Sequence, residues 1–373
     1  MKKVGKEVLF LHTSERNARN GESTMLRLAD GRILHAYTAY IGNSKDDGAS
    51  ARICGVYSAD QGESWSAPRV LLEKPRDAQN IMSPSLLRLA DGALGIVYLR
   101  KDAHRDGLSC MPVFSRSEDE GESWSAPVFL DLPRGYYCAI NDGAITLRDG
   151  GLCVPLSYAG ERLTAKGFDG ASTVLLVLSR DNGKTWQPHP HTFRSPIPDA
   201  KGLQEPGVCE LEDGTLWVWM RTAYGHQYQS LSKDGGKRFS PVLPNLRFPS
   251  PDAPMRIKQI GGKAVAIYNP LGYTPLSDAT ELWGSPKRTP LVLTLAEDDG
   301  ASLCDPAATS ADGGFRRLAA QTYYIEDSTA DSYCYPAICE TEDGILVSYY
   351  HSDGGTHCLN ATKITKIYRH ELA

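Results

Sequence analysis

Five residues of the 373-residue chain stand at one fixed distance from a repeated turn, and their side chains could bind or react with a ligand. The residue eight positions before each Asp-Gly turn is polar or phenolic, although its neighbours are mostly apolar. Strands of about 6 to 8 residues would bring all five to one face, opposite the turns. Converging polar groups are costly to bury unless they bind something, so this shared distance from the turns predicts a ligand site. The alternative is that loop ends are polar in any protein. The five residues are Glu22, Ser83, Asn141, Glu205 and Tyr335.

The Asp-Gly turns belong to a repeat that nearly fills the chain. A tight turn of Asp and Gly between two runs of strand-forming residues is a strong sign of a β-hairpin. Six copies follow one another at intervals of roughly 60 residues, one of them degenerate. They are LADGRIL (28–34), LADGALG (89–95), LRDGGLC (147–153), LEDGTLW (211–217), the degenerate IGGKAVA (260–266) and TEDGILV (341–347).

A second motif, of the form Ser-x-Asp-x-Gly-x-x-Trp, alternates with these turns. Its Asp can accept hydrogen bonds from backbone N–H groups, its Gly can take a positive φ, and its aromatic ring can pack beneath the turn. These boxes therefore indicate a fold rather than a reaction. The copies are SADQGESW (58–65), SEDEGESW (117–124), SRDNGKTW (179–186), SKDGGKRF (232–239) and a degraded AEDDGASL (296–303).

The alternation of turn and box predicts two successive hairpins in each unit, which makes four antiparallel strands. Six such units predict an all-β chain, a six-bladed β-propeller of four-stranded blades that occupies residues 1–373 as a single domain. Closing the ring requires EVLFLHT (7–13) to pair with strands near the carboxyl end.

Composition excludes several classes of function. The net charge of −5 and pI near 6.0 argue against a nucleic-acid or membrane-surface partner, since both favour a basic protein. The amino terminus holds only the short apolar run VLFL, and no apolar run approaches the roughly 18 to 20 residues that span a bilayer. The odd number of cysteines, nine, indicates reduced thiols. A cytoplasmic protein is therefore expected.

Cofactor and metal motifs are absent from the sequence. HPH (189–191) and HSDGGTH (351–357) lack a recognised metal-ligand spacing and are interpreted as surface loops. Neither a GxGxxG strand-to-helix turn, a phosphate loop nor a G-x-S-x-G elbow occurs. We therefore expect neither a cofactor nor a metal.

With its boxes and turns, the chain resembles the sialidase (neuraminidase) superfamily of Asp-box propellers over its whole length. Boxes also occur in other propellers, so the segment LQEPGVCELEDGTLWVWMRT (203–222) is more specific. It is similar to the sialidase segment in which a Glu begins an inner strand and an Arg ends the neighbouring one. Those positions are Glu205 and Arg221, which the turn register also places on one face.

The resemblance implies three arginines that bind the carboxylate of a sugar, a task that suits the planar, always charged guanidinium group. Arg221 is one, and Arg288, before a strand that leads to the degraded fifth box, is another. Arg19 is the nearest match for the first, with Arg16 as a competitor, because the usual Arg-Ile-Pro signature of the family is missing. Any single arginine could instead form a surface salt bridge.

The resemblance also implies a catalytic pair of Tyr335, as nucleophile, and Glu205, as the base that takes its proton. A neutral phenol suits a substrate whose anomeric carbon bears a carboxylate, since an anionic nucleophile would be repelled. Tyr333 is a nearby alternative with poorer register. The family takes its general acid from the loop that corresponds to IGNSKDDGASARI, which offers Asp47 or, second, Asp46.

Four further residues could read the ring hydroxyls or the glycerol tail of a sugar: Asn141, Asp142, Arg100 and Tyr228. The resemblance thus implies a retaining exo-glycosidase that removes a terminal α-linked sialic acid or a related carboxylated sugar. Two alternatives stay open: specificity for another acidic sugar, either uronic or deaminated, and a propeller that binds glycan or protein without chemistry. Linkage, aglycone, physiological role and oligomeric state are not predicted.

Overall fold

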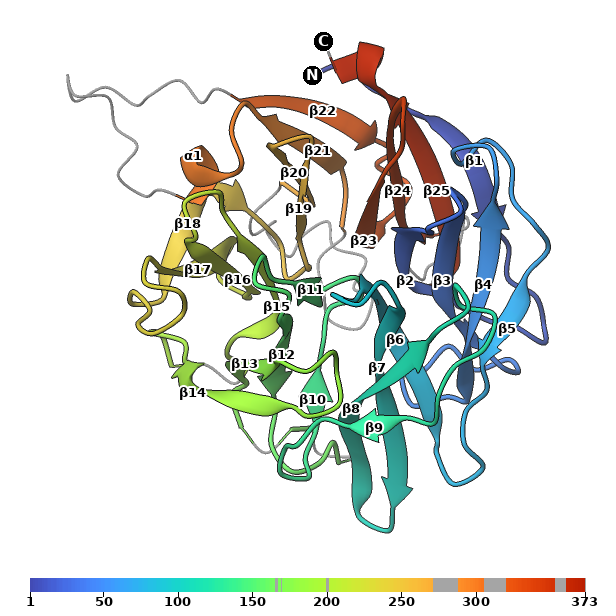
Figure 1. Cartoon of the computed structure of the whole chain (residues 1–373), viewed down its shortest axis with the longest axis vertical. Coiled ribbons are helices and arrows are strands. Elements are labelled where there is room, and N and C mark those ends of the chain that lie inside the picture. Colours follow the sequence, from blue (N-terminus) through green and yellow to red (C-terminus); the bar gives the residue numbers. More distant parts are fainter. Residues whose placement is uncertain are drawn as a thin grey trace.

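The computed structural model shows six antiparallel sheets arranged in a ring, the six blades of a β-propeller (Figure 1). It describes residues 1–164, 167–168, 170–198, 201–270, 288–304, 320–352 and 360–372. Besides strands, these residues form the short helices α1 (Ala301–Cys304) and η2 (Arg369–Leu372). The predicted six-bladed, all-β architecture is confirmed.

In blades 1 to 5, the strands follow one another in sequence from the axis outward. Blades 1 and 2 consist of β2 (Asn20–Arg27), β3 (Ile33–Tyr40), β4 (Ala51–Ser58) and β5 (Arg69–Leu72), and of β6 (Asn80–Arg88), β7 (Leu94–His104), β8 (Gly107–Ser117) and β9 (Val128–Phe129). Blade 3 has a divided inner edge, β10 (Tyr137–Cys138) and β11 (Ile145–Thr146), followed by β12 (Leu152–Tyr158), β13 (Thr173–Ser179) and β14 (Gln187–Phe193).

Blades 4 and 5 repeat the pattern. They consist of β15 (Gln204–Glu210), β16 (Leu216–Arg221), β17 (His226–Ser232) and β18 (Leu243–Pro249), and of β19 (Arg256–Ile260), β20 (Lys263–Tyr268), β21 (Leu291–Ala296) and β22 (Ala320–Glu326).

Blade 6 closes the ring with strands from both ends of the chain. Its inner strands are β23 (Tyr333–Glu340), β24 (Gly344–His351) and β25 (Ala361–Tyr368), and its outer strand is β1 (Lys6–Leu11), which pairs with β25. The two chain ends accordingly lie together in Figure 1. The predicted pairing of the amino-terminal strand near the carboxyl end is confirmed.

The Asp-Gly turns and the boxes occupy the face that the register assigned to them, because the turns join first to second strands and the boxes join third to fourth. In the second box, Asp119 accepts hydrogen bonds from the Ser117 hydroxyl and from the amide of Ser123, at 2.8 and 2.9 Å. Gly121 takes a φ of 85°, a conformation that favours glycine. The polar groups of the box therefore form hydrogen bonds with one another within the turn.

An irregularity recurs where the inner strands begin, at the end of the axis opposite the turns. Pairing slips by a bulge after Gly21, Met82, Gln204 and Cys334. A bulge bends its strand and re-aims side chains, and each non-glycine residue held at positive φ stores strain that the surrounding fold must offset. Five residues along the inner edges of the blades have positive φ, and four of them belong to the set counted from the turns. They are Glu22 (46°), Ser83 (55°), Asp142 (58°, between β10 and β11), Glu205 (39°) and Tyr335 (55°).

Apolar side chains between neighbouring blades hold the ring together. Trp186 packs with Phe114 between blades 2 and 3, and Trp217 and Trp219 pack with Phe248 between blades 4 and 5. All three indoles are at most 2% exposed. Because each burial of an aromatic side chain contributes roughly 1.5–3 kcal/mol, these clusters fix the blades that carry the polar residues around the axis.

Candidate active site

The phenol of Tyr335 and the carboxylate of Glu205 meet where the inner strands of blades 6 and 4 begin. Tyr335 Oη donates a 2.5 Å hydrogen bond to Glu205 Oε1. Burial, followed by the charge of Glu205, raises the pKa of Tyr335 well above its usual value, although Arg221 and Arg288 act in the opposite direction. The phenol is therefore neutral at physiological pH, and its proton has an acceptor in place.

Arg221, at the end of β16, joins this pair directly. Its Nη1 donates to Glu205 Oε2 at 2.5 Å and lies 3.4 Å from Tyr335 Oη. Its Nε donates to Asp252 Oδ1 at 2.6 Å. The guanidinium is thus held between two carboxylates beside the phenol, as a charge-assisted network.

Arg288 approaches from blade 5, and its guanidinium carbon lies 5.7 Å from the centre of the Tyr335 ring. Its Nη2 donates to the backbone oxygen of Asp252 at 2.9 Å. Its backbone amide donates to Ser332 Oγ at 2.9 Å, just before β23. The residues Tyr335, Glu205, Arg221 and Arg288 therefore form one contiguous group from three blades.

Arg19 reaches the same end of the axis from blade 1 and is only 1% exposed. Its Nε donates to Tyr350 Oη at 2.9 Å, its Nη2 to Glu22 Oε1 at 2.9 Å and its Nη1 to Asp47 Oδ1 at 2.5 Å. The ring of Tyr350 meets that of Tyr335 edge-on, with centroids 5.8 Å apart, and so connects Arg19 to the group. All three guanidinium nitrogens thus have partners.

Arg16, the competitor of Arg19, lies elsewhere. It is exposed and lines a separate cavity of about 410 Å³ between β1 and blade 1, together with His12 and Tyr37. Of the two arginines that the sequence left open, Arg19 is the one that contacts Asp47.

Of the two candidates for the general acid, Asp47 contacts the site and Asp46 does not. The Asp47 side chain is 60% exposed, yet its carboxylate faces Arg19, whereas Asp46 is exposed and accepts a 3.3 Å hydrogen bond from Ser44 Oγ. Partial desolvation would raise the pKa of Asp47, but the charges of Arg19 and Lys101 outweigh it and hold that pKa at about 2. The backbone oxygen of Asp47 accepts from Lys101 Nζ at 2.8 Å and from Asn80 Nδ2 at 2.7 Å.

The described charges around this end of the axis favour an anion. Five cationic side chains face four carboxylates, which leaves a formal excess of one positive charge. The cations are Arg19, Lys101, Lys201, Arg221 and Arg288, and the carboxylates are Glu22, Asp47, Glu205 and Asp252.

The four residues expected to read a sugar have other contacts. Asn141 is buried and its Nδ2 donates to the backbone oxygens of Ser23 and Tyr335, at 2.6 and 3.3 Å. Asp142 lies deeper on the axis, 2.7 Å from Lys258 Nζ and 3.3 Å from Arg256 Nε. On the outer side, Arg100 forms ion pairs with Asp77 and Asp102, and Tyr228 packs in the core between blades 3 and 4.

Sequence reasoning missed three residues of the site. Tyr350 is one position before the residue that a forward count of eight from the turn selects, so a tolerance of one position would have found it. Lys101 lies beside Arg100 within β7, and no spacing from a turn distinguishes it from its neighbours. Asp252 lies in the loop between blades 4 and 5, outside the register of any turn, and the sequence carries no signal for it.

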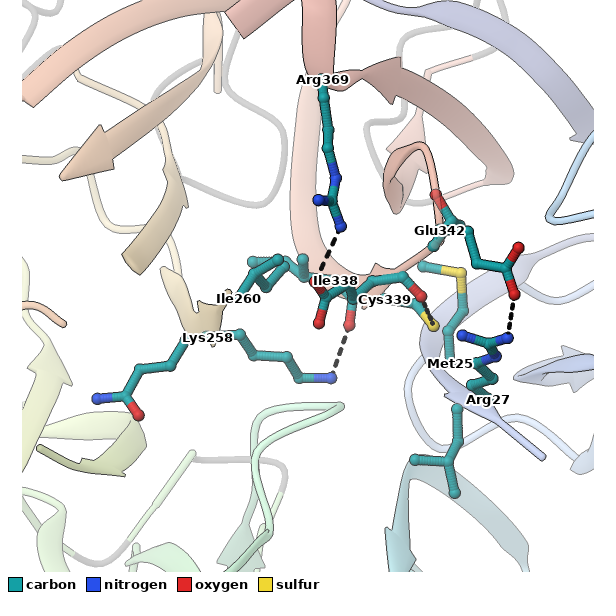
Figure 2. A pocket seen from close by; sticks show the side chains of 12 residues that line it. Met25, Arg27, Lys258, Ile260, Ile338, Cys339, Glu342 and Arg369 are labelled. Carbon is teal, nitrogen blue, oxygen red and sulfur yellow. Dashed lines mark hydrogen bonds and ion pairs between the residues drawn. The ribbon is translucent and has the colours of Figure 1, made fainter. Parts of the chain in front are cut away.

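The opposite end of the axis holds a cavity of about 630 Å³ between the ends of β2, β19 and β23 (Figure 2). Its lining carries three cations and two carboxylates, and each cation has a partner. Arg27 pairs with Glu342 at 2.5 Å, Arg369 pairs with Glu340 at 3.4 Å, and Lys258 Nζ donates to the backbone oxygen of Ile338 at 2.7 Å (Figure 2). The Tyr335–Glu205 pair, in contrast, lies at the other end of the axis.

Within the described ranges, three or more His, Cys, Asp or Glu side chains do not gather anywhere as a metal site. Residues 353–357 of the HSDGGTH stretch lie outside those ranges. In the same part of the chain, every helix is too short or too polar to cross a bilayer.

Comparison with known proteins gives a family and relatives. Residues 30–348 match the family described as BNR repeat-like domain. A sialidase of Paraclostridium sordellii is 24% identical over 232 residues, which cover 56% of this chain and 54% of that protein. The chain thus spans about half the length of this relative.

Solved structures match over nearly the whole chain. A protein of unknown function from Dyadobacter fermentans has a TM-score of 0.71 at 19% identity and covers 97% of this chain and 98% of its own. The intramolecular trans-sialidase of Ruminococcus gnavus, in complex with oseltamivir carboxylate, has a TM-score of 0.70 at 15% identity, with coverage of 99% and 98%. At such identities the likeness establishes the fold alone. Because the family match covers most of the chain and agrees with the ring of blades, the protein belongs to the BNR repeat-like domain family and is a sialidase-superfamily β-propeller.

Proposed function

We propose that the protein is a retaining exo-glycoside hydrolase that removes a terminal α-linked sialic acid or a related carboxylated sugar. The observation that carries the proposal is the 2.5 Å hydrogen bond from Tyr335 Oη to Glu205 Oε1, made beside two arginines. A purely binding propeller has no need of a buried phenol with a proton acceptor in contact. The sialidases among its relatives support the same class of reaction.

In the first step, Arg221, Arg288 and Arg19 bind the substrate carboxylate. Tyr335 Oη forms a bond to the anomeric carbon while the glycosidic C–O bond breaks and Glu205 takes the phenolic proton. Asp47, which takes up a proton when the substrate carboxylate displaces it from Arg19, gives that proton to the leaving oxygen. A neutral nucleophile avoids repulsion by the carboxylate on that carbon. The product is a glycosyl-enzyme and a free alcohol.

In the second step, water attacks the anomeric carbon and gives a proton to Asp47, and the bond to Tyr335 breaks. The tyrosine oxygen recovers its proton from Glu205, so both residues return to their starting state. Two inversions at one carbon give overall retention.

The proposal is tested with an aryl sialoside and with 2,3-difluorosialic acid, whose fluorine at C3 slows hydrolysis of the glycosyl-enzyme. The wild type should release the aryl alcohol and carry a covalent label on the peptide that contains Tyr335. Tyr335→Phe should lose at least about 10³-fold in turnover and carry no label, since the nucleophile is removed. Tyr333→Phe is the matched control, because Tyr333 packs in the core against Tyr349. Full activity in Tyr335→Phe, or a label on another residue, contradicts the proposal.

A second acidic sugar is a specific alternative. The sequence Arg19-Asn20 replaces the family's Arg-Ile-Pro signature, and Asn20 Nδ2 donates to the backbone oxygen of His12 at 3.0 Å rather than facing the site. Aryl glycosides of a deaminated keto sugar and of a uronic acid separate the cases by their kcat/KM values. Saturable binding of all of them without any product would instead assign a glycan-binding propeller.

A further inference from the structure

One loop between blades 4 and 5 contacts two of the three arginines. Asp252, in the segment Ser250-Pro251-Asp252-Ala253, accepts from Arg221 Nε through its carboxylate at 2.6 Å. Its backbone oxygen accepts from Arg288 Nη2 at 2.9 Å. A single residue thus touches one arginine from blade 4 and another from blade 5, through two different acceptors.

The buried side chain of Gln227 holds the loop in place. Gln227, on β17, donates through Nε2 to Ser250 Oγ at 2.9 Å and to the backbone oxygen of Ala253 at 2.8 Å. Ser250 also donates its amide to the backbone oxygen of Gly225 at 2.8 Å. Because both ends of the turn are bonded to blade 4, the position of Asp252 is set by the scaffold and not by a ligand.

The carboxylate of Asp252 is strongly held as an anion. Its second oxygen accepts from Lys201 Nζ at 2.7 Å, and the residue is only 6% exposed. Although burial alone would raise the pKa of Asp252, the charges and hydrogen bonds of Arg221 and Lys201 hold it well below its usual value. Asp252 is therefore an anion at neutral pH.

We propose that Asp252 is a positioning residue, which fixes the spacing and orientation of Arg221 and Arg288 for a ligand carboxylate. This inference rests on the proposed function. Arg221 uses Nε for Asp252 and Nη1 for Glu205, and within the described residues its Nη2 makes no hydrogen bond to the protein. A pre-ordered guanidinium binds a carboxylate more tightly, because less side-chain freedom is lost on binding.

The two acceptors of Asp252 can be separated by mutation. Asp252→Ala removes the carboxylate but keeps the backbone oxygen, so Arg221 loses its partner and Arg288 keeps its own. KM for the aryl sialoside, and Kd for an unsaturated sialic acid analogue, should rise about tenfold or more, with a smaller change in kcat. Asp252→Asn keeps the volume and should weaken binding less, in the same direction. Asp327→Asn, which breaks an exposed ion pair with Lys3, is the matched control.

Double-mutant cycles identify the arginine through which Asp252 acts. The effect of Asp252→Ala on Kd should nearly vanish in an Arg221→Ala background and persist in an Arg288→Ala background. Full additivity with Arg221→Ala overturns the inference. Wild-type protein without activity or binding would instead refute the proposed function.

A ligand-free crystal structure of Asp252→Ala then decides the positioning role by itself. We expect the Arg221 guanidinium to leave its place beside Glu205. An unchanged Arg221 overturns the inference whatever the substrate is.

Discussion

Arg19 Nη1 donates a 2.5 Å hydrogen bond to Asp47 Oδ1, so the arginine proposed to bind the substrate carboxylate is occupied by the proposed general acid. The other two nitrogens of Arg19 are bonded to Tyr350 and Glu22, both of which are buried. Asp47, the exposed partner, is therefore the one that a ligand carboxylate is expected to displace in order to reach Arg19. Displacement removes a cation from Asp47 and brings a like charge near it, and both changes raise the pKa of its carboxyl.

Binding of a carboxylate ligand should consequently take up a proton. In the free protein the pKa of Asp47 is about 2, held there against partial desolvation by the charges of Arg19, Lys101 and Arg288. Since the bound state has the higher pKa, affinity should strengthen as pH falls through that bound-state value. Calorimetry of an unsaturated sialic acid analogue in two buffers of different ionisation heat measures the uptake.

Asp47→Asn is the control for this linkage. It should show no proton uptake and should bind the analogue more tightly than the wild type, because the charge that competes with the ligand for Arg19 is removed. Equal heats in both buffers for the wild type would refute the coupling.

Gly21→Ala should damage the site through Tyr350. A Cβ on Gly21 would overlap the ring of Tyr350, which is fully buried and holds Arg19 Nε. Overpacking of this kind costs about 1–3 kcal/mol of the free energy of unfolding, measured by urea titration. KM for a carboxylated substrate should rise as well, because Arg19 loses a partner.

The double variant Gly21→Ala, Tyr350→Leu distinguishes the two effects. The smaller side chain should restore part of the stability but leave KM high, since leucine cannot accept from Arg19. Recovery of KM together with stability would show that Tyr350 only fills space.

Sequence patterns predicted the ring because turn and strand lengths are local properties. The same register placed Glu205 and Tyr335 on one face, and the structure brings them into contact. The bulges that bend the starts of these strands lie at positions that the turn count does not single out. The sequence did not predict Asp252 because its position depends on Gln227, which lies 25 residues earlier in the chain and holds the loop around it. No count from a turn relates the two residues.

A box should contribute to stability without affecting catalysis. Hydrogen bonds from the side chain and amide of Ser123 hold the pKa of Asp119 at about 2, below its usual value. Because this folded-state pKa is depressed, the stabilisation is complete above the unfolded-state pKa near 4 and is lost as pH falls toward 2. Asp119→Ala should therefore lower the free energy of unfolding at pH 7 by about 1 kcal/mol, an amount limited by the exposure of the turn.

Urea titrations of wild type and Asp119→Ala across this pH range test the linkage. The difference between them should shrink toward pH 2, while KM at neutral pH stays that of the wild type, because the box is on the face opposite the site. A constant difference at all pH values would contradict the assignment.

Lys101 should act on the site by its charge. It is only 3% exposed, and its Nζ donates to the backbone oxygen of Asp47 and lies 5.7 Å from the centre of the Tyr136 ring. Lys101→Met removes the formal excess of positive charge, so Kd for a carboxylate ligand should rise several-fold, and more at low salt than at high salt. Stability should change little, because Asn80 Nδ2 still donates to the same oxygen at 2.7 Å. Lys101→Arg keeps the charge and should retain most of the affinity. An equal loss of affinity in both variants would show that the shape of the side chain matters and its charge does not.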